Sequence, residues 1–283
     1  MSLLRPTSVL RPQFIQSSAG RILISHFVPA EPSPERHALL CIPPFADEMN
    51  KSRHMLSLLA RTLVGQSIEC CLVDLFGTGD SEGDFGKASW QDWCNDVVAA
   101  STWLQQRGVS NISMLGLRSG ALLAADLIQR QALSINTLVL WQPVVDGEVF
   151  LNQFLRLRLA AQMLGEKREA SSTEALRYSL SQSESVEVAG YMLSADLAQS
   201  LNALKLIDLD IPHLKQVCWL ELTTRQDASL RPASRAVLEH WQAQSARLTS
   251  AVIEGPAFWT TSEITQVPEL IQATVDCLLG DRR

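Results

Sequence analysis

The most informative segment of the chain reads NISMLGLRSGALLAADLIQ and covers residues 111–129. Its opening run, 111–115, predicts a short buried strand, and apolar residues recur with helical spacing from residue 119 onward. Gly116 and Gly120 enclose the dipeptide Arg118-Ser119 and permit a tight turn between strand and helix. A strand that passes through a short turn into a helix is the repeating unit of a parallel sheet.

The same alternation extends along most of the chain. We predict further strands at 21–29, 37–43, 68–75, 135–143, 216–222 and 247–255, and helices at 55–64, 90–104, 119–131, 232–244 and 269–280. Asn50 and Ser52 are candidate caps for the helix at 55–64. The alternation predicts an α/β protein with a mainly parallel central sheet and helices on both faces. Pattern alone leaves another doubly wound α/β fold as an equal alternative.

The alternation stops between residues 146 and 210, where we find no convincing strand. Amphipathic helical segments fill this span, so we predict a core in two parts, 1–145 and 211–283, and a helical cap at 146–210. A late helical insertion lies over the carboxyl ends of parallel strands, where ligands bind. The alternative is that 146–210 only adds packing.

Composition narrows the classes of function. The chain has 283 residues, of which 46% are hydrophobic, and a net charge of −6, so neither nucleic acid nor an anionic membrane is expected as partner. The six cysteines form no C-x-x-C pair, and no metal or other cofactor is predicted. The first 20 residues have the pattern of neither a signal peptide nor a membrane anchor, so we expect a cytoplasmic protein without a membrane span and with reduced thiols.

Three motifs together resemble the α/β-hydrolase superfamily over essentially the whole chain. They are VDLFGTGDS at 73–81, IPPFADE at 42–48 and LGLRSGA at 115–121. The resemblance implies a turn after an early strand, an oxyanion loop and the strand-to-helix elbow that carries the nucleophile in G-x-S-x-G. It favours an α/β-hydrolase fold. The glycine-rich turn at 73–81 is expected to be architectural.

A narrower resemblance is carried by four segments. PPFADEMNKSR at 43–53, GLRSGALLA at 116–124, GEVFLNQFLRLRLAA at 147–161 and GPAFW at 255–259 are similar to the family named exosortase A system-associated hydrolase 2. This resemblance implies a link to the machinery that sorts PEP-CTERM proteins and makes exopolysaccharide in Gram-negative bacteria. It implies no substrate.

The triad positions of the superfamily are altered in this chain. Arg118 stands where the elbow carries its nucleophile, and Ser119 follows one place late. The resemblance implies that Ser119 offers its backbone N–H to an oxyanion, and its hydroxyl is expected to cap the following helix. A guanidinium is always protonated and cannot attack a carbonyl.

The other positions follow from the same resemblance. Pro43 and Pro44 have no N–H, so Phe45 is the first residue of the oxyanion loop that can donate one. Asp227 falls where the acid follows its strand, and Phe258 occupies the place of the histidine. His54 could approach the site from the other side, but it is expected on a surface helix. Ordinary Ser-His-Asp hydrolysis is therefore not expected.

The positive charge of Arg118 is expected to need a negative partner. At a helix N-terminus its guanidinium adds to a positive dipole end and needs a negative partner, which Asp227, Glu48 or a bound anion can supply. As a structural element, Arg118 would pair with Asp227. As a functional element, it would bind a carboxylate, a phosphate or an acyl-enolate oxygen.

Two classes of function remain open. The protein is either a hydrolase acting on an ester, a thioester or a lipid-linked precursor through polar groups around Arg118, or a catalytically silent binder of an anionic metabolite or partner. The expected ligand in both is a small acyl or anionic molecule. The sequence identifies neither the substrate nor the oligomeric state.

Overall fold

The computed structural model describes residues 8–31, 33–164, 172–225, 228–244 and 247–280. A central eight-stranded sheet has the order β1-β2-β4-β3-β5-β6-β9-β10. Its strands are β1 Ser8–Gln16, β2 Arg21–Pro29, β3 His37–Ile42, β4 Ile68–Val73, β5 Asn111–Leu117, β6 Thr137–Trp141, β9 Gln216–Thr223 and β10 Arg247–Glu254. β2 pairs antiparallel with both β1 and β4, and all other pairs are parallel. The predicted mainly parallel sheet is confirmed.

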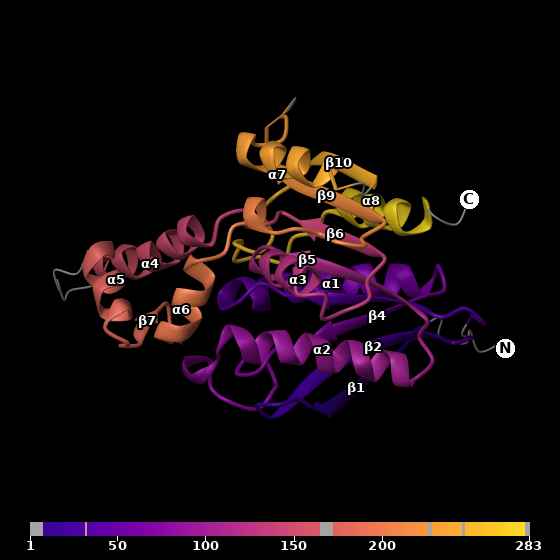
Figure 1. Ribbon diagram of the computed structural model, residues 1–283, viewed down its shortest axis with the longest axis horizontal. Helices are drawn as coiled ribbons and strands as arrows, with labels where there is room; N and C mark the ends of the chain where they lie inside the picture. The colour runs from indigo at the N-terminus through magenta and orange to yellow at the C-terminus, as the bar shows by residue number, and fades with distance from the viewer. Residues whose placement is uncertain (1–7, 32, 165–171, 226–227, 245–246, 281–283) are drawn as a thin grey trace.

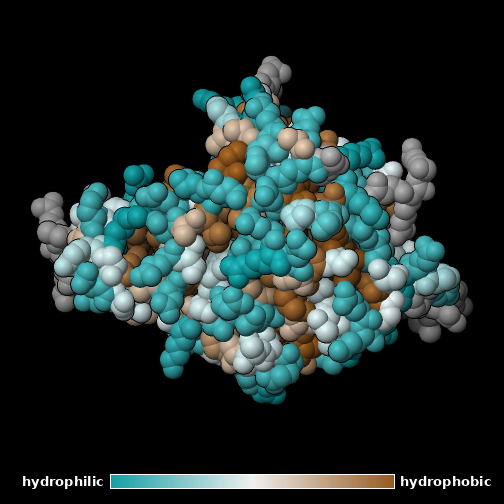
Figure 2. Space-filling model, in the orientation of Figure 1, coloured by the Kyte–Doolittle hydropathy of each residue, from teal (hydrophilic) through white to brown (hydrophobic). Residues whose placement is uncertain are grey.

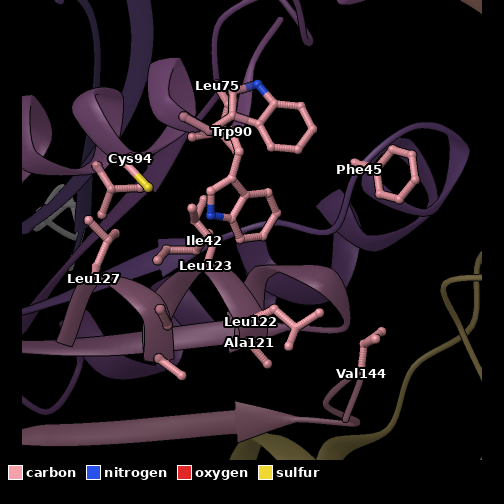
Figure 3. Close-up of a cluster of buried hydrophobic side chains, with 14 of the residues drawn as sticks. Ile42, Phe45, Leu75, Trp90, Cys94, Ala121, Leu122, Leu123, Leu127 and Val144 are labelled. Atoms are coloured by element: carbon pink, nitrogen blue, oxygen red, sulfur yellow. The ribbon is translucent and has the colours of Figure 1, made fainter. Parts of the chain in front are cut away.

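Helices cover both faces of this sheet (Figure 1). They are α1 Asp47–Val64, α2 Trp90–Gln106, α3 Ser119–Gln129, α7 Pro232–Gln242 and α8 Pro268–Leu279. Buried side chains of α2, α3 and α7 share one apolar cluster, and those of α1 and α8 share the other. Figure 3 shows part of the first cluster, in which Trp90 of α2 lies near Leu123 of α3 and Ile42 of β3. Alternate residues of each central strand enter opposite clusters, as the buried apolar runs predict.

The structure differs from the predictions at two places near the N-terminus. β1 was not predicted, because an edge strand buries little and its residues Leu10 and Phe14 remain about half exposed. Pro12 is tolerated there since an edge strand leaves one row of N–H groups unpaired. α1 begins at Asp47 rather than near residue 55, so the predicted caps Asn50 and Ser52 are wrong and lie inside the helix. The charged start of α1 hid its helical period.

The segment 146–210 contains strands as well as helices, which corrects the prediction of a purely helical insertion. Its elements are α4 Gly147–Leu164, α5 Thr173–Ser181, β7 Val186–Val188, β8 Tyr191–Leu193 and α6 Ala195–Asn202. β7 and β8 form a hairpin whose turn residues Ala189 and Gly190 have φ of 49° and 84°. Both values are positive, as a tight hairpin turn requires. Three residues per strand are too few for a recognisable alternation. Figure 1 shows α4, α5, β7 and α6 grouped together to the left of the sheet.

The state of two cysteines also differs from the expectation of reduced thiols. Cys218 of β9 and Cys277 of α8 are joined by a disulfide, so the expectation of reduced thiols is wrong for this pair. The two residues are 59 positions apart, and only the packing of α8 on β9 brings them together. Cys41, Cys70, Cys71 and Cys94 are free and buried.

The cytoplasmic location stays a prediction. Among the described helices, none combines the length and the apolar character needed to cross a membrane.

The start of α3 is pressed against the loop that follows β3. A Cβ atom on Gly120 would collide with the carbonyl oxygen of Ile42 and would lie 2.7 Å from that of Pro43. A Cβ on Gly116 would lie 2.6 Å from Cα of Ala121. Real Cβ atoms do not approach backbone this closely, so both glycines of the elbow are required by packing. This contact fixes the carboxyl end of the sheet, where the site lies.

We predict that Gly120→Ala destabilises the protein by about 1–3 kcal/mol, because the rigid backbone atoms facing the new methyl group must move apart. Urea unfolding followed by circular dichroism measures the change. Gly280→Ala is the matched control, since a Cβ at Gly280 meets nothing within 4 Å and its φ is −57°. Equal stability of the two variants would contradict the close approach of α3 to the loop.

Candidate functional site

Arg118 alone joins β5 to α3, and its backbone is strained. Its φ of 55° and ψ of −116° lie in a region that residues with a side chain rarely adopt. Three backbone hydrogen bonds hold it there: Arg118 N donates to Trp141 O at 3.0 Å, and Ala121 N and Val144 N each donate to Arg118 O at 3.1 Å. Strain that the surroundings fix in this way clusters at functional sites. The outlier therefore marks Arg118 as a candidate.

The guanidinium of Arg118 lies between a carboxylate and two aromatic rings. Nε is 3.3 Å from both carboxylate oxygens of Glu48, and Nη2 is 3.2 Å from Oε1. Nη1 donates to the carbonyl oxygen of Gln142 at 3.4 Å. Cζ is 5.3 Å from the ring centre of Trp259 and 5.6 Å from that of Phe150, within the range of cation–π attraction. Of the two acids considered from sequence, Glu48 is described and lies here, whereas Asp227 lies outside the described residues.

A cavity of about 490 Å³ opens at this pair. It lies between α4, the start of α1 and the loop after β10, and is lined by Phe45, Ala46, Asp47, Glu48, Lys51, Arg118, Phe150, Gln153, Phe154, Leu157, Ala189, Trp259 and Thr260. A second cavity of about 280 Å³ shares Arg118, Phe150 and Gln153 with the first and continues toward Arg231. Arg118 therefore contacts both spaces. The face of the molecule drawn in Figure 2 is largely hydrophilic, and hydrophobic residues show between the polar ones.

The charges of the larger cavity fall into two pairs. Lys51 Nζ is 2.7 Å from a carboxylate oxygen of Asp47, one helical turn away. Glu48 faces Arg118, and the two side chains are 20% and 13% exposed. Burial raises the pKa of the Glu48 carboxyl above its ordinary value, although the nearby Arg118 guanidinium opposes this shift. Among the described residues, Glu48 is thus the carboxylate that pairs with Arg118.

The predicted oxyanion donors are arranged differently from the expectation. Phe45 N donates to the hydroxyl oxygen of Ser119 at 3.1 Å, so this N–H is not free to bind an oxyanion. Ser119 is 4% exposed and is the first residue of α3, whose start carries no side-chain cap. The prediction that Ser119 caps the helix is wrong, because the close contact at Gly120 turns its hydroxyl toward the loop.

Phe258 does not line the cavity, which corrects its place in the predicted site. Its ring is 1% exposed and packs edge-to-face with Trp141, with the ring centres 6.1 Å apart. The next residue, Trp259, faces Arg118 instead. Sequence reasoning also missed Phe150 and Phe154, although their spacing with Leu157 on α4 is that of one helix face.

The cavity lining contains no histidine, and all five histidines lie in described residues. His26 pairs with Glu69, and His240 pairs with Asp210. His54 lies on α1, where its ring contacts the Gln266 amide. His37 contacts Ser113, and His213 lies in the loop before β9. Asp227 lies outside the described residues, so its predicted role stays a prediction. Within the described chain, no group of three or more His, Cys, Asp or Glu side chains could hold a metal ion.

Comparison with known proteins agrees with this architecture. Residues 36–194 match the family described as serine aminopeptidase, S33. The match spans more than half of the chain, so the protein belongs to this hydrolase family and has the α/β-hydrolase fold. No protein with a curated description matches its sequence.

Solved structures resemble the whole chain. Est1E from Butyrivibrio proteoclasticus with bound ferulic acid shares 15% identity and a TM-score of 0.66, over 95% of this chain and 98% of its own. A putative hydrolase from Agrobacterium vitis S4 shares 17% identity, a TM-score of 0.61 and coverage of 98% and 99%. A monoglyceride lipase from Saccharomyces cerevisiae shares 11% identity, a TM-score of 0.62 and coverage of 95% and 94%. At these identities the likeness establishes the fold.

We predict that Arg118→Gly is more stable than Arg118→Ala by about 1 kcal/mol, because glycine adopts the observed φ without strain and both variants lose the guanidinium. Chemical denaturation of the two variants measures the difference. Lys51 lines the same cavity on a regular helix, so the order must reverse there, with Lys51→Ala above Lys51→Gly. The same order at both positions would argue against a strained elbow.

Proposed function

We propose that this α/β-hydrolase binds a small amphiphilic anion in the cavity beneath α4, with Arg118 holding the anionic head and the aromatic walls holding an acyl or similar apolar body. The observation that supports this most is the guanidinium at the elbow position. Arg118 occupies the strained residue between β5 and α3, and its side chain lines the cavity. In this proposal the site retains the ligand pocket of the fold without a nucleophile at its centre.

The chemistry of the lining suits such a ligand. Phe45, Phe150, Phe154, Leu157 and Trp259 offer apolar surface for a hydrocarbon or aromatic body. The guanidinium can bind a carboxylate or phosphate through two parallel hydrogen bonds. The first-turn amides of α3 add a positive helix end beside it. These features favour an anion whose head and body differ in polarity.

The same residues argue against a Ser-His-Asp mechanism. Arg118 cannot attack an acyl carbon, since its guanidinium keeps its proton. The Ser119 hydroxyl accepts a hydrogen bond from Phe45 N, and the cavity lining lacks an imidazole to take up a proton. We therefore propose ligand binding without catalysis as the first candidate function. Hydrolysis of an ester or thioester is the second candidate, and membership of a hydrolase family favours it.

We expect octanoate to raise the melting temperature of the wild type and to leave that of Arg118→Ala unchanged, because the carboxylate then has no guanidinium to bind. Differential scanning fluorimetry at increasing octanoate gives the readout. Lys51→Ala, which removes the other cation of the cavity, should respond like the wild type. No shift for the wild type, or a shift that depends on Lys51 alone, would refute the assignment to Arg118.

Hydrolysis of an ester or thioester, the second candidate function, is tested with separate substrates. We expect no turnover of p-nitrophenyl esters or acyl thioesters above the buffer rate and no label from a fluorophosphonate probe. Turnover that is lost in Arg118→Ala would establish hydrolysis at this site. Labelling that is lost in Ser119→Ala would show that Ser119 is a reactive nucleophile after all.

We further propose that the protein acts beside an exosortase and exopolysaccharide system. The support is the similarity of four sequence segments to exosortase A system-associated hydrolase 2. Deleting the gene in a Gram-negative host that carries both should change the amount of correctly sorted PEP-CTERM protein or of exopolysaccharide. Unchanged levels of both would remove this proposal and leave the ligand site untouched.

A further inference from the structure

The acid that faces Arg118 occupies the place that a ligand anion would need. Among the described lining residues of the cavity, the charged side chains are Asp47, Glu48 and Lys51 from α1 and Arg118 from the elbow. Lys51 binds Asp47, which leaves Glu48 and Arg118 facing each other. The lining residues from α4 and from the loop after β10 are uncharged: Phe150, Gln153, Phe154, Leu157, Trp259 and Thr260. The smaller cavity, which Arg118 also lines, adds Asp146 and Arg231, and Asp146 pairs with Lys205. Glu48 is thus the described acid paired with Arg118 and the group that competes with a ligand for it.

The contact between Glu48 and Arg118 is long for an ion pair. Its N–O distances are 3.2 and 3.3 Å, whereas charge-assisted hydrogen bonds of this kind are typically about 2.7–2.9 Å long. Elsewhere in the protein, Arg53–Asp74 and Arg130–Asp126 both reach 2.8 Å, whereas the more exposed Arg177–Glu148 pair is 3.5 Å long. Glu48 therefore balances the charge of Arg118 without forming a close bidentate pair. A better-fitting anion can replace it.

A ligand anion that replaces Glu48 at Arg118 would change the protonation of Glu48. Burial already raises the pKa of Glu48, and the attraction of Arg118 is the main influence that opposes this rise. A ligand anion on Arg118 would neutralise that attraction and add a negative charge nearby, and both effects raise the pKa of Glu48 further. A group whose pKa rises on binding takes up protons.

We infer that Glu48 is a built-in competitor for the anion site of Arg118, and that an amphiphilic anion binds there together with a proton taken up by Glu48. This inference rests on the proposed function and adds its control by pH. Lowering the pH protonates Glu48 and frees Arg118, so affinity rises as the pH falls toward the pKa of Glu48. The favoured ligands are those whose heads stay ionised under these conditions, such as sulfonates, sulfates and phosphates.

Isothermal titration calorimetry with octane-1-sulfonate tests this directly. The sulfonate does not titrate, so any pH effect belongs to the protein. Titrations at several pH values between about 5 and 7, each in two cationic buffers that differ in ionisation enthalpy and supply no organic anion, give the number of protons taken up on binding. We expect the wild type to take up a fraction of a proton, at most about one, and to bind more tightly at lower pH.

Variants separate the roles of the charged residues. Glu48→Gln should bind about tenfold more tightly near pH 7 and take up no proton, because the competing charge is absent. Glu239→Gln is the matched control, because Glu239 is an exposed carboxylate on α7 outside the cavity, and this variant should keep the proton uptake of the wild type. Arg118→Ala should show no binding heat.

The outcomes distinguish this inference from the proposed function. Binding that needs Arg118 but involves no proton uptake in the wild type overturns the role of Glu48 and leaves the proposed function standing. Absence of binding to the wild type at every pH removes the proposed function itself. The proton count of the wild type needs no variant, so a folding defect in Glu48→Gln leaves the test intact.

Discussion

The first turn of α3 approaches the loop after β3 so closely that only glycine fits at residue 120, where a side chain would strike the carbonyl oxygens of Ile42 and Pro43. The site depends on this contact. It brings the Ser119 hydroxyl to the Phe45 amide, and it leaves Arg118 as the single strained residue between strand and helix. Because the loop runs directly into α1, the same contact sets Glu48 opposite Arg118.

The charges of the site follow from the meeting of two helix starts. The N-terminal ends of α1 and α3 carry positive dipole charge, and the cavity lies where they converge. Asp47 and Glu48 lie in the first turn of α1, where their negative charges interact favourably with the positive helix end. Arg118 adds another positive charge, and its guanidinium lies near the rings of Phe150 and Trp259 rather than in open water. An anion bound at this point would lie near both helix ends and the guanidinium, and Glu48 is the acid that the described structure pairs with that guanidinium.

The sequence predicted most of the core, because buried strands and amphipathic helices leave strong periods. β2, predicted at 21–29, has those bounds, and most other core elements differ from their predictions by a few residues. The elements that were missed have weak patterns. β1 is an exposed edge, and β7 and β8 have three residues each. The start of α1 is rich in charged residues, which masks helical periodicity.

At the candidate site, the residue types that stand at the elbow can be read from the chain alone. Arg118 in place of a nucleophile, the glycines around it and the absence of histidine beyond residue 240 are all visible in the chain. The neighbours that these residues contact depend on how the chain folds. Glu48 faces the guanidinium, Trp259 rather than Phe258 lines the cavity, and the Ser119 hydroxyl accepts a hydrogen bond from the Phe45 amide. The physical reason is that a residue type fixes charge and shape locally, whereas a partner is chosen by the packing of segments distant in sequence.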